Sequence, residues 1–411
     1  NVVYVILNGP SDKAGLQIGD KIIKVNDSLL SGRAFSIDEI KNYIRGPRGS
    51  KAVLQILRNG KQQTVTVTRG TIPVPSVDAA YMIDKTTGYI KLNKFTENSF
   101  EEFMQAMEAL KKRGLQSLVF DLEGNGGGFM NEAVDMADEF LDGDKLVVYT
   151  QGINSKKREY RCKRPGIFET GKLVVLVDEF SASASEVLAG ALQDWCRAKI
   201  IGRRTFGKGL VQEQYPLGDG SAIRLTVARY YTPLGRSIQR SYQKGRKIYM
   251  DEILQRHSNG ELLFADSNKI NNGKIFITNC RDTVYGGEGI MPNVFVPIDS
   301  SFYEQKLNAL IAGSSLNNYI YNYYLRHSQK MEQYNSPSDY VKRFNAGELW
   351  DGFIKYPAAA IDFKSINSKE KELIQLRLKA LLARYRWRSE GFYQVLNSDD
   401  PVIQKALELI K

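Results

Sequence analysis

The sequence predicts an α/β protein, with a small β-rich unit before the core and a helical region after it. Between residues 86 and 202, short apolar runs such as "LQSLVFDL" and "KLVVLVDEF" alternate with amphipathic segments of helical periodicity. This alternation is typical of βαβ units and predicts a parallel sheet that is covered on both faces. The first 70 residues instead contain strands with turn signals, and beyond residue 300 the pattern is helical and rich in Tyr, Lys and Arg.

Length and composition describe an ordinary soluble chain of two or three domains. It has 411 residues, 42% hydrophobic and 25% charged, and no apolar run approaches the roughly 20 residues of a membrane span. The opening "NVVYVILNGP" lacks a signal-peptide pattern and resembles the middle of a strand, so we expect targeting signals to lie upstream. The net charge of +11 comes from scattered basic residues, which favours a solvated surface over a nucleic-acid partner.

The cysteine pattern favours neither a disulfide framework nor a zinc site. The chain has three cysteines, Cys162, Cys196 and Cys280, which is an odd number, and none are in C-x-x-C spacing. They therefore do not indicate the cellular compartment.

Residues 1–70 are predicted to form one unit. "SIDEIKNYIRG" begins with a capping box from Ser36 to Glu39 and then places Ile37, Ile40 and Ile44 at helical spacing. "AVLQILRNGKQQTVTVTR" predicts two strands joined through Asn59-Gly60.

With "AGLQIGDKIIKVN" and "IRGPRGSKAVLQILR", this stretch resembles a PDZ domain. The resemblance implies that it binds the extended C-termini of peptides by strand addition, with Ile40 and Ile44 as peptide-binding residues. The loop that holds the terminal carboxylate would precede Asn1.

After a linker at "TIPVPSV", residues 71–300 are predicted to form the core. Strands at "GYIKLNKF", "LQSLVFDL", "KLVVLVDEF" and "RAKIIG" are separated by helices at "SFEEFMQAMEALKKRG", "MNEAVDMADEFLDG" and "SASEVLAGALQDW". "GLVQEQYPL" and "AIRLTVARYYTP" then predict antiparallel strands. Residues 301–411 are predicted to be a helical region without a recognisable motif.

Three loops are expected at the carboxyl ends of the core strands, where α/β proteins gather their sites. They are "EGNGGGF", "EFSASASE" and "GRRTFGKG". Gly202 to Lys208 fits the body of a phosphate-binding loop, but Gly209 stands where Ser or Thr is required and a strand is predicted where a helix is required. A nucleotide site is therefore disfavoured.

The serine loop has two interpretations. Ser183 precedes Glu186 by three residues, so it can be simply the capping residue of a helix. A serine in that place also lies beside free backbone N–H groups, and the amide of Ala184 could bind an oxyanion. "GNGGGF" supplies a second loop of accessible amides, or merely a tight turn between a strand and a helix.

A nucleophilic serine needs a base, and both histidines, His257 and His327, lie in polar contexts far downstream. A lysine can serve if burial keeps it neutral. Lys208, between two glycines in an apolar stretch, is the candidate, although most lysines are simply solvated. On a strand it would share a face with Gln212, which could orient the amine.

"SASASEVLAGALQDW" and "GRRTFGKGLVQ", behind a PDZ-like unit, resemble the carboxyl-terminal processing (tail-specific) serine proteases. The resemblance extends to about residue 240 and, more loosely, through "VYGGEGIMPNVFVP". It implies a crotonase-like core of ββα units. The nucleophile would be Ser183, the general base Lys208 and the residue that positions this base Gln212. The oxyanion amides would be those of Ala184, Gly127 and Gly128.

The same resemblance gives Ser181 and Ser185 supporting roles. Asp194 matches an aspartate that is important in some members, but a solvated charge on the helix is its alternative. The family's loop reads L-R-x-N-P-G-G, whereas this chain has Glu123 and Gly126 in place of the arginine and the proline. We therefore expect a looser loop without the arginine's ion pair.

The expected function is that of a Ser-Lys endopeptidase cleaving unstructured or C-terminal tails of proteins, without metal or cofactor. A regulatory adaptor or a second copy would be its further partner, and an extracytoplasmic, periplasmic or membrane-associated setting is implied. The alternative is an inactive PDZ scaffold that only binds peptides.

Overall fold

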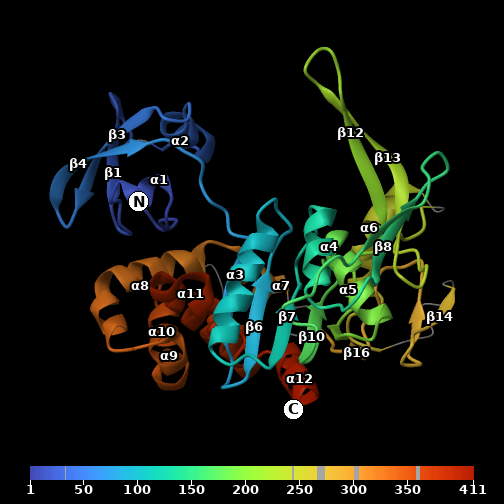
Figure 1. Cartoon of the computed structure of the whole chain (residues 1–411). Helices are drawn as coiled ribbons and strands as arrows, with labels where there is room; N and C mark the ends of the chain where they lie inside the picture. The colour runs from blue at the N-terminus through green and yellow to red at the C-terminus, as the bar shows by residue number, and fades with distance from the viewer. Residues whose placement is uncertain (33, 243–244, 266–273, 300–304, 358–361) are drawn as a thin grey trace.

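The computed structural model describes residues 1–32, 34–242, 245–265, 274–299, 305–357 and 362–411. It contains an N-terminal β unit, a central α/β core with a projecting β-ribbon, and a C-terminal bundle of helices (Figure 1). The mixed α/β class predicted from the sequence is confirmed.

The N-terminal unit is a four-stranded sheet in the order β2-β1-β3-β4. Its elements are α1 (Pro10–Lys13), β1 (Lys21–Val25), β2 (Ser28–Leu29), α2 (Ile37–Ile44), β3 (Lys51–Arg58) and β4 (Lys61–Thr68). The predicted hairpin is confirmed, since β3 and β4 pair through Asn59 and Gly60, both at positive φ. The predicted capping box at Ser36 is also present. On α2, Ile40 and Ile44 are 37% and 38% exposed.

The central sheet has six strands in the order β16-β11-β10-β7-β6-β5, all parallel except β5. The strands are β5 (Val77–Met82), β6 (Thr87–Leu92), β7 (Ser117–Asp121), β10 (Lys172–Val177), β11 (Lys199–Gly202) and β16 (Val294–Phe295). Side chains alternate between two cores along β10. Val175 and Val177 pack with α3 (Ser99–Lys112), α4 (Met130–Asp138) and α5 (Ala184–Asp194). Val174 and Leu176 face α12 (Pro401–Ile410).

A second sheet in the order β12-β13-β8-β9 stands beside the core. Its strands are β8 (Leu146–Gln151), β9 (Arg158–Arg161), β12 (Leu210–Pro216) and β13 (Ala222–Tyr231). The predicted antiparallel pairing of β12 and β13 is confirmed. The chain then forms α6 (Arg246–Ser258) and a small hairpin of β14 (Ile275–Ile277) and β15 (Thr283–Tyr285).

One disulfide joins Cys196, just after α5, to Cys280 in the turn between β14 and β15. The prediction against disulfides was therefore wrong for two of the three cysteines. The partners are 84 residues apart in sequence and only the fold brings them together. Cys162 is a buried free thiol.

The C-terminal bundle consists of α7 (Gln305–Ala312), α8 (Ser315–Glu332), α9 (Pro337–Arg343), α10 (Gly347–Phe353) and α11 (Ser368–Leu396) around its own apolar core. No described helix is both long and apolar enough to cross a membrane. Within α11 the helical geometry breaks at Trp387 and Arg388, and Arg388 has φ +57°. A residue other than glycine adopts this backbone conformation only at a cost of order 1–3 kcal/mol.

The break in α11 places Arg388 against the N-terminal unit. Its Nη1 donates a hydrogen bond to the Val5 carbonyl at 2.6 Å, and its guanidinium lies over the Tyr4 ring, as does that of Arg384. Beyond the break, Tyr393 and Asn397 contact β5. One helix therefore links the N-terminal unit, the bundle and the core.

We expect Arg388→Ala to loosen the N-terminal unit without unfolding the core, because it removes the hydrogen bond to Val5 and the contact with Tyr4. Amide hydrogen exchange should become faster in residues 1–7 and in the 69–76 linker. Arg386→Ala is the control, since Arg386 is exposed and its guanidinium lies over Trp387 of the same helix. Equal exchange in both variants would contradict this role of Arg388.

Candidate active site

Three loops meet at the carboxyl end of the central sheet, as the sequence analysis expected: 122–129 after β7, 178–183 after β10 and 203–209 after β11. β12, and not a helix, follows Lys208. This arrangement lacks the helix N-terminus that a phosphate-binding loop requires.

Ser183 ends the turn between β10 and α5 in an unusual backbone conformation, with φ +58° and ψ −111°. Of the three alternating serines it alone is partly exposed, while Ser181 and Ser185 are fully buried. The strained turn therefore presents Ser183 at the surface and at the N-terminus of a buried helix, where free N–H groups gather.

The buried serines fasten this turn to the glycine loop. Ser181 Oγ donates to the Leu122 carbonyl and Ser185 Oγ to the Asn125 carbonyl, each at 2.8 Å. Asp178 adds a link by accepting from Gly124 N at 2.9 Å. Both serines thus hold the two loops in register.

Gly127 lies directly against the nucleophile turn. A Cβ at this position would lie 2.8 Å from Ser183 Cβ and 2.9 Å from Ala184 N, so no side chain fits. The amide of Gly127 is already engaged, since it donates to Asn125 Oδ1 at 2.9 Å. Among the described residues, no acceptor engages Ala184 N or Gly128 N.

Asn125 is a site residue that the sequence analysis did not single out. It is fully buried, and its side chain donates to the Leu92 carbonyl while accepting from Gly127. Its carbonyl accepts from Ala182 N and Ser185 Oγ. Asn125 therefore fixes the glycine loop. At Gly126 a Cβ would have no atom within 4 Å, as expected of a glycine with more conformational freedom.

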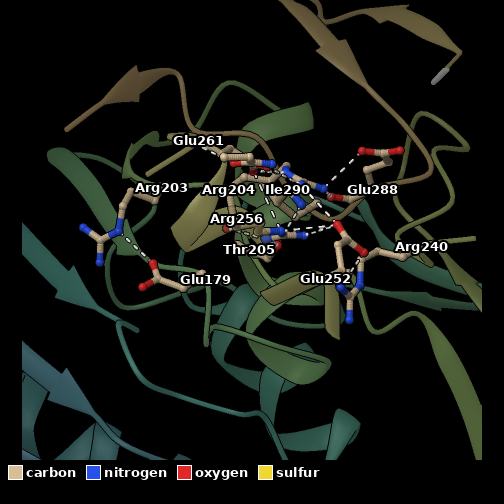
Figure 2. A network of polar contacts seen from close by, with 12 residues as sticks. Glu179, Arg203, Arg204, Thr205, Arg240, Glu252, Arg256, Glu261, Glu288 and Ile290 are labelled. Carbon is tan, nitrogen blue, oxygen red and sulfur yellow. Dashed lines mark hydrogen bonds and ion pairs between the residues drawn. The ribbon is translucent and has the colours of Figure 1, made fainter. Parts of the chain in front are cut away.

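Glu123, which replaces the arginine of the family's loop, lies near an arginine of the lysine loop. Arg203 Nη2 lies 4.0 Å from the Glu123 carboxylate, and its Nε pairs with Glu179 at 2.7 Å. Figure 2 shows Arg203 directed at Glu179. Burial, followed by the charge of Asp121, raises the pKa of Glu123 well above its ordinary value. A raised pKa favours the uncharged acid, so the main ionic partner of Arg203 is Glu179 and not Glu123.

Glu186 connects the nucleophile turn to the lysine loop. One carboxylate oxygen accepts from Ser183 N at 2.8 Å and from Lys208 N at 2.9 Å. The other accepts from Thr205 Oγ1 at 2.5 Å and from Gly207 N at 2.6 Å. Burial raises the pKa of Glu186, while these four donors act in the opposite direction by stabilising the carboxylate. The sequence suggested only a capping role.

A buried network of charges supports the lysine loop from the other side (Figure 2). Arg256 of α6 donates to the Thr205 carbonyl at 2.8 Å. Glu252 pairs with Arg204, Arg240 and Arg256. The Arg240 guanidinium lies between the rings of Phe206 and Tyr249, 4.3 Å and 4.2 Å from their centroids. The 203–209 backbone is thereby held between α5 and α6.

The side chains of Lys208 and Gln212 are not assembled with Ser183. Both are exposed, contrary to the burial expected for Lys208. No hydrogen bond among the described residues joins either side chain to Ser183. The structure thus combines a formed Ser183 turn and glycine loop with Lys208 and Gln212 side chains that are exposed to solvent.

The two histidines lie on helices, His257 in the last turn of α6 and His327 in α8 against Tyr323. Asp194 is not a solvated helix charge, which corrects that alternative. It is fully buried and pairs with Arg236 at 2.5 Å.

Comparison with protein families gives three matches. Residues 86–245 match the model of peptidase family S41, and residues 2–58 match that of the PDZ domain. Residues 306–388 match a family of unknown function (DUF8443).

The curated proteins that are similar to this chain include two carboxyl-terminal-processing proteases. The carboxy-terminal-processing protease of Bartonella bacilliformis is 37% identical over 244 residues, which are 58% of this chain and 55% of that protein. The carboxyl-terminal-processing protease of Synechocystis sp. is 37% identical over 246 residues, 58% of this chain and 56% of that protein. The chain thus spans little more than half the length of these relatives.

Two solved structures are also similar to this chain. The photosystem II D1 C-terminal processing protease is 34% identical with a TM-score of 0.37, over 56% of this chain and 62% of that one. A putative S41 protease from Bacteroides fragilis is 16% identical with a TM-score of 0.41, over 73% of this chain and 72% of that one.

Proposed function

We propose that this chain, in which residues 86–245 belong to peptidase family S41 and follow a PDZ domain at residues 2–58, is a serine endopeptidase. Its substrates are proteins with unstructured or C-terminal tail segments, which its PDZ domain delivers or gates. The observation that carries the proposal is the strained Ser183 turn at the N-terminus of α5, with the glycine loop packed against it.

In the proposed mechanism, Ser183 Oγ attacks the carbonyl carbon of the scissile peptide bond while Lys208 takes its proton. The N–H groups of Ala184 and Gly128 stabilise the tetrahedral oxyanion. Lys208 then donates the proton to the departing amine, and water hydrolyses the acyl-enzyme. Gln212 orients the lysine amine.

Catalysis by Ser183 and Lys208 requires a conformational step, because their side chains are not in contact in the structure. A lysine acts as a base only in its neutral form, which burial favours. Because Lys208 is exposed, we propose that bound substrate covers it and brings its amine to Ser183. The Glu186 link already holds the two backbones together, so the step needs only movement of the Lys208 side chain.

The setting and the core architecture are further parts of the proposal. A disulfide between Cys196 and Cys280 supports an oxidising, extracytoplasmic compartment, as in the periplasm. The strand and helix order of the core is compatible with crotonase-like ββα units. An adaptor or a second copy would regulate the site.

The test is cleavage of an unfolded protein such as casein. Wild-type protein should digest it, while Ser183→Ala and Lys208→Ala should each reduce kcat by about 10³-fold or more. Equal digestion by wild type and Ser183→Ala would show that another group is the nucleophile. No digestion by wild type, with peptide tails still bound, would favour the inactive PDZ scaffold.

A further inference from the structure

The ribbon of β12 and β13, here called the arm, projects from the body of the protein (Figure 1). Its strands pair from Leu210 with Arg229 to Pro216 with Ala222. In its outer half, residues 212–216 and 222–226, every residue is exposed. No described element therefore covers either face of the arm there.

The two faces of the outer arm differ in chemistry. Tyr215 pairs with Ile223, and the next pair on that face is Glu213 with Leu225, where Glu213 accepts a hydrogen bond from the Tyr215 hydroxyl. Apart from Glu213, this face is apolar, and it is called the apolar face below. Tyr215, Ile223 and Leu225 are 44%, 45% and 51% exposed. The opposite face carries polar pairs, Gln214 with Arg224 and Gln212 with Thr226. An isolated two-stranded ribbon is marginal in water, and a gathered apolar face marks an interaction site.

The apolar face continues into a hollow at the base of the arm. This cavity of about 980 Å³ lies between the arm and the 151–155 loop. Its wall contains the apolar Leu210, Tyr215 and Val227 and also polar residues, among them Glu213, Thr226 and Arg229. Ile153 on that loop also lines it and is fully exposed. Leu210 follows Lys208 by two residues, so the hollow reaches the lysine loop.

The outer edge of β12 is unpaired. In the order β12-β13-β8-β9, β12 is the terminal strand, and its outward N–H and C=O groups have no strand partner among the described residues. An extended chain can pair with such an edge through its backbone, whatever its sequence. Every second side chain of that chain would then lie on the apolar face.

We propose that the arm and the hollow at its base bind an extended segment of the substrate polypeptide, with apolar side chains at alternate positions. This inference rests on the proposed peptidase function and names a second substrate-binding surface besides the PDZ domain. The position of this surface favours substrate, and not a second copy of this chain, as the molecule that occupies it. The surface leads to Lys208, so a chain bound along β12 approaches the base, whereas a second copy would obstruct that approach.

The test compares two sets of substitutions on the arm in the Ser183→Ala background, where nothing is cleaved. The triple variant Tyr215→Ser/Ile223→Ser/Leu225→Ser removes the apolar face. The control Gln214→Ser/Arg224→Lys alters the polar face, keeps its charge, and leaves Gln212 and every residue that lines the hollow intact. Binding of fluorescein-labelled β-casein, an unfolded protein, is measured by anisotropy. We expect the Kd to rise about tenfold or more in the triple variant and to stay unchanged in the control.

Three results would overturn the proposal. One is an equal Kd in all variants. Another is a loss of affinity in the control that matches that of the triple variant. The third is a fall in molar mass by light scattering from dimer to monomer in the triple variant, which would assign the face to a second copy. Single Leu225→Ser is measured alongside, so that the comparison stands if the triple variant misfolds.

The binding assay also separates this proposal from the peptidase proposal. If wild-type protein cleaves nothing but β-casein binding still depends on the apolar face, the arm surface stands and the peptidase function fails. If wild type cleaves, the triple variant should lower kcat/KM for β-casein through KM. Cleavage of an octapeptide too short to reach the outer arm should be unchanged.

Discussion

Glu186→Gln is expected to reduce kcat for unfolded substrates by about 100-fold while changing KM little. Each oxygen of the Glu186 carboxylate accepts two hydrogen bonds. The donors to one oxygen are Ser183 N and Lys208 N, and the donors to the other are Thr205 Oγ1 and Gly207 N. Glutamine replaces one oxygen by an NH₂ group, which cannot accept. Two donors then lose their acceptor and the loops separate, and a displacement of about 1 Å at a reacting group can cost 10²-fold.

Glu132→Gln is the matched control for this prediction. Glu132 is partly shielded, less than the fully buried Glu186, and it accepts a backbone hydrogen bond from Phe100 N at 2.8 Å. It touches neither the Ser183 turn nor the lysine loop. The measurements are kcat and KM together with thermal unfolding of both variants. If Glu186→Gln kept wild-type kcat, or if Glu132→Gln lost as much, the link through Glu186 would not position the reacting groups.

The local signals in the sequence were sufficient for the fold of the core. Continuous apolar runs predicted the parallel strands, and helical periodicity predicted α3, α4 and α5, because the residues that these elements bury are visible in the sequence. The hairpin at Asn59-Gly60 was predictable because few residue pairs adopt its backbone conformation. The placement of α12 was not predictable from the sequence. Its apolar face, which includes Val402 and Ala406, does not reveal which surface of the protein it covers.

At the site, sequence motifs identified the loops but not the contacts between them. Asn125 and Glu186 each join segments that are distant in sequence, and nothing near either residue signals its partners. The burial of Lys208 was expected from its apolar neighbours, but neighbours in sequence do not determine how a loop side chain points. Asp194 was assigned a solvated alternative for the same reason, because its partner Arg236 lies 42 residues further along the chain.

Asp194→Ala is expected to lower the free energy of unfolding by about 3–5 kcal/mol, the usual cost of breaking a buried ion pair. Asp194 Oδ1 accepts from Arg236 Nη2 at 2.5 Å, and Oδ2 accepts from Leu234 N at 3.0 Å. Both side chains are fully buried. Burial already lowers the pKa of Arg236, and without Asp194 its charge would have no counterion. Chemical denaturation followed by circular dichroism measures the loss.

The double variant Asp194→Leu/Arg236→Met distinguishes an uncompensated charge from lost packing. Removing both partners leaves no buried charge, so we expect it to be clearly more stable than Asp194→Ala. A double variant as unstable as the single one would mean that the hydrogen bonds to Leu234, Gln193 and Tyr285 dominate instead. Recovery of stability would instead show that Asp194, the last residue of α5, stabilises the fold mainly by neutralising the charge of Arg236.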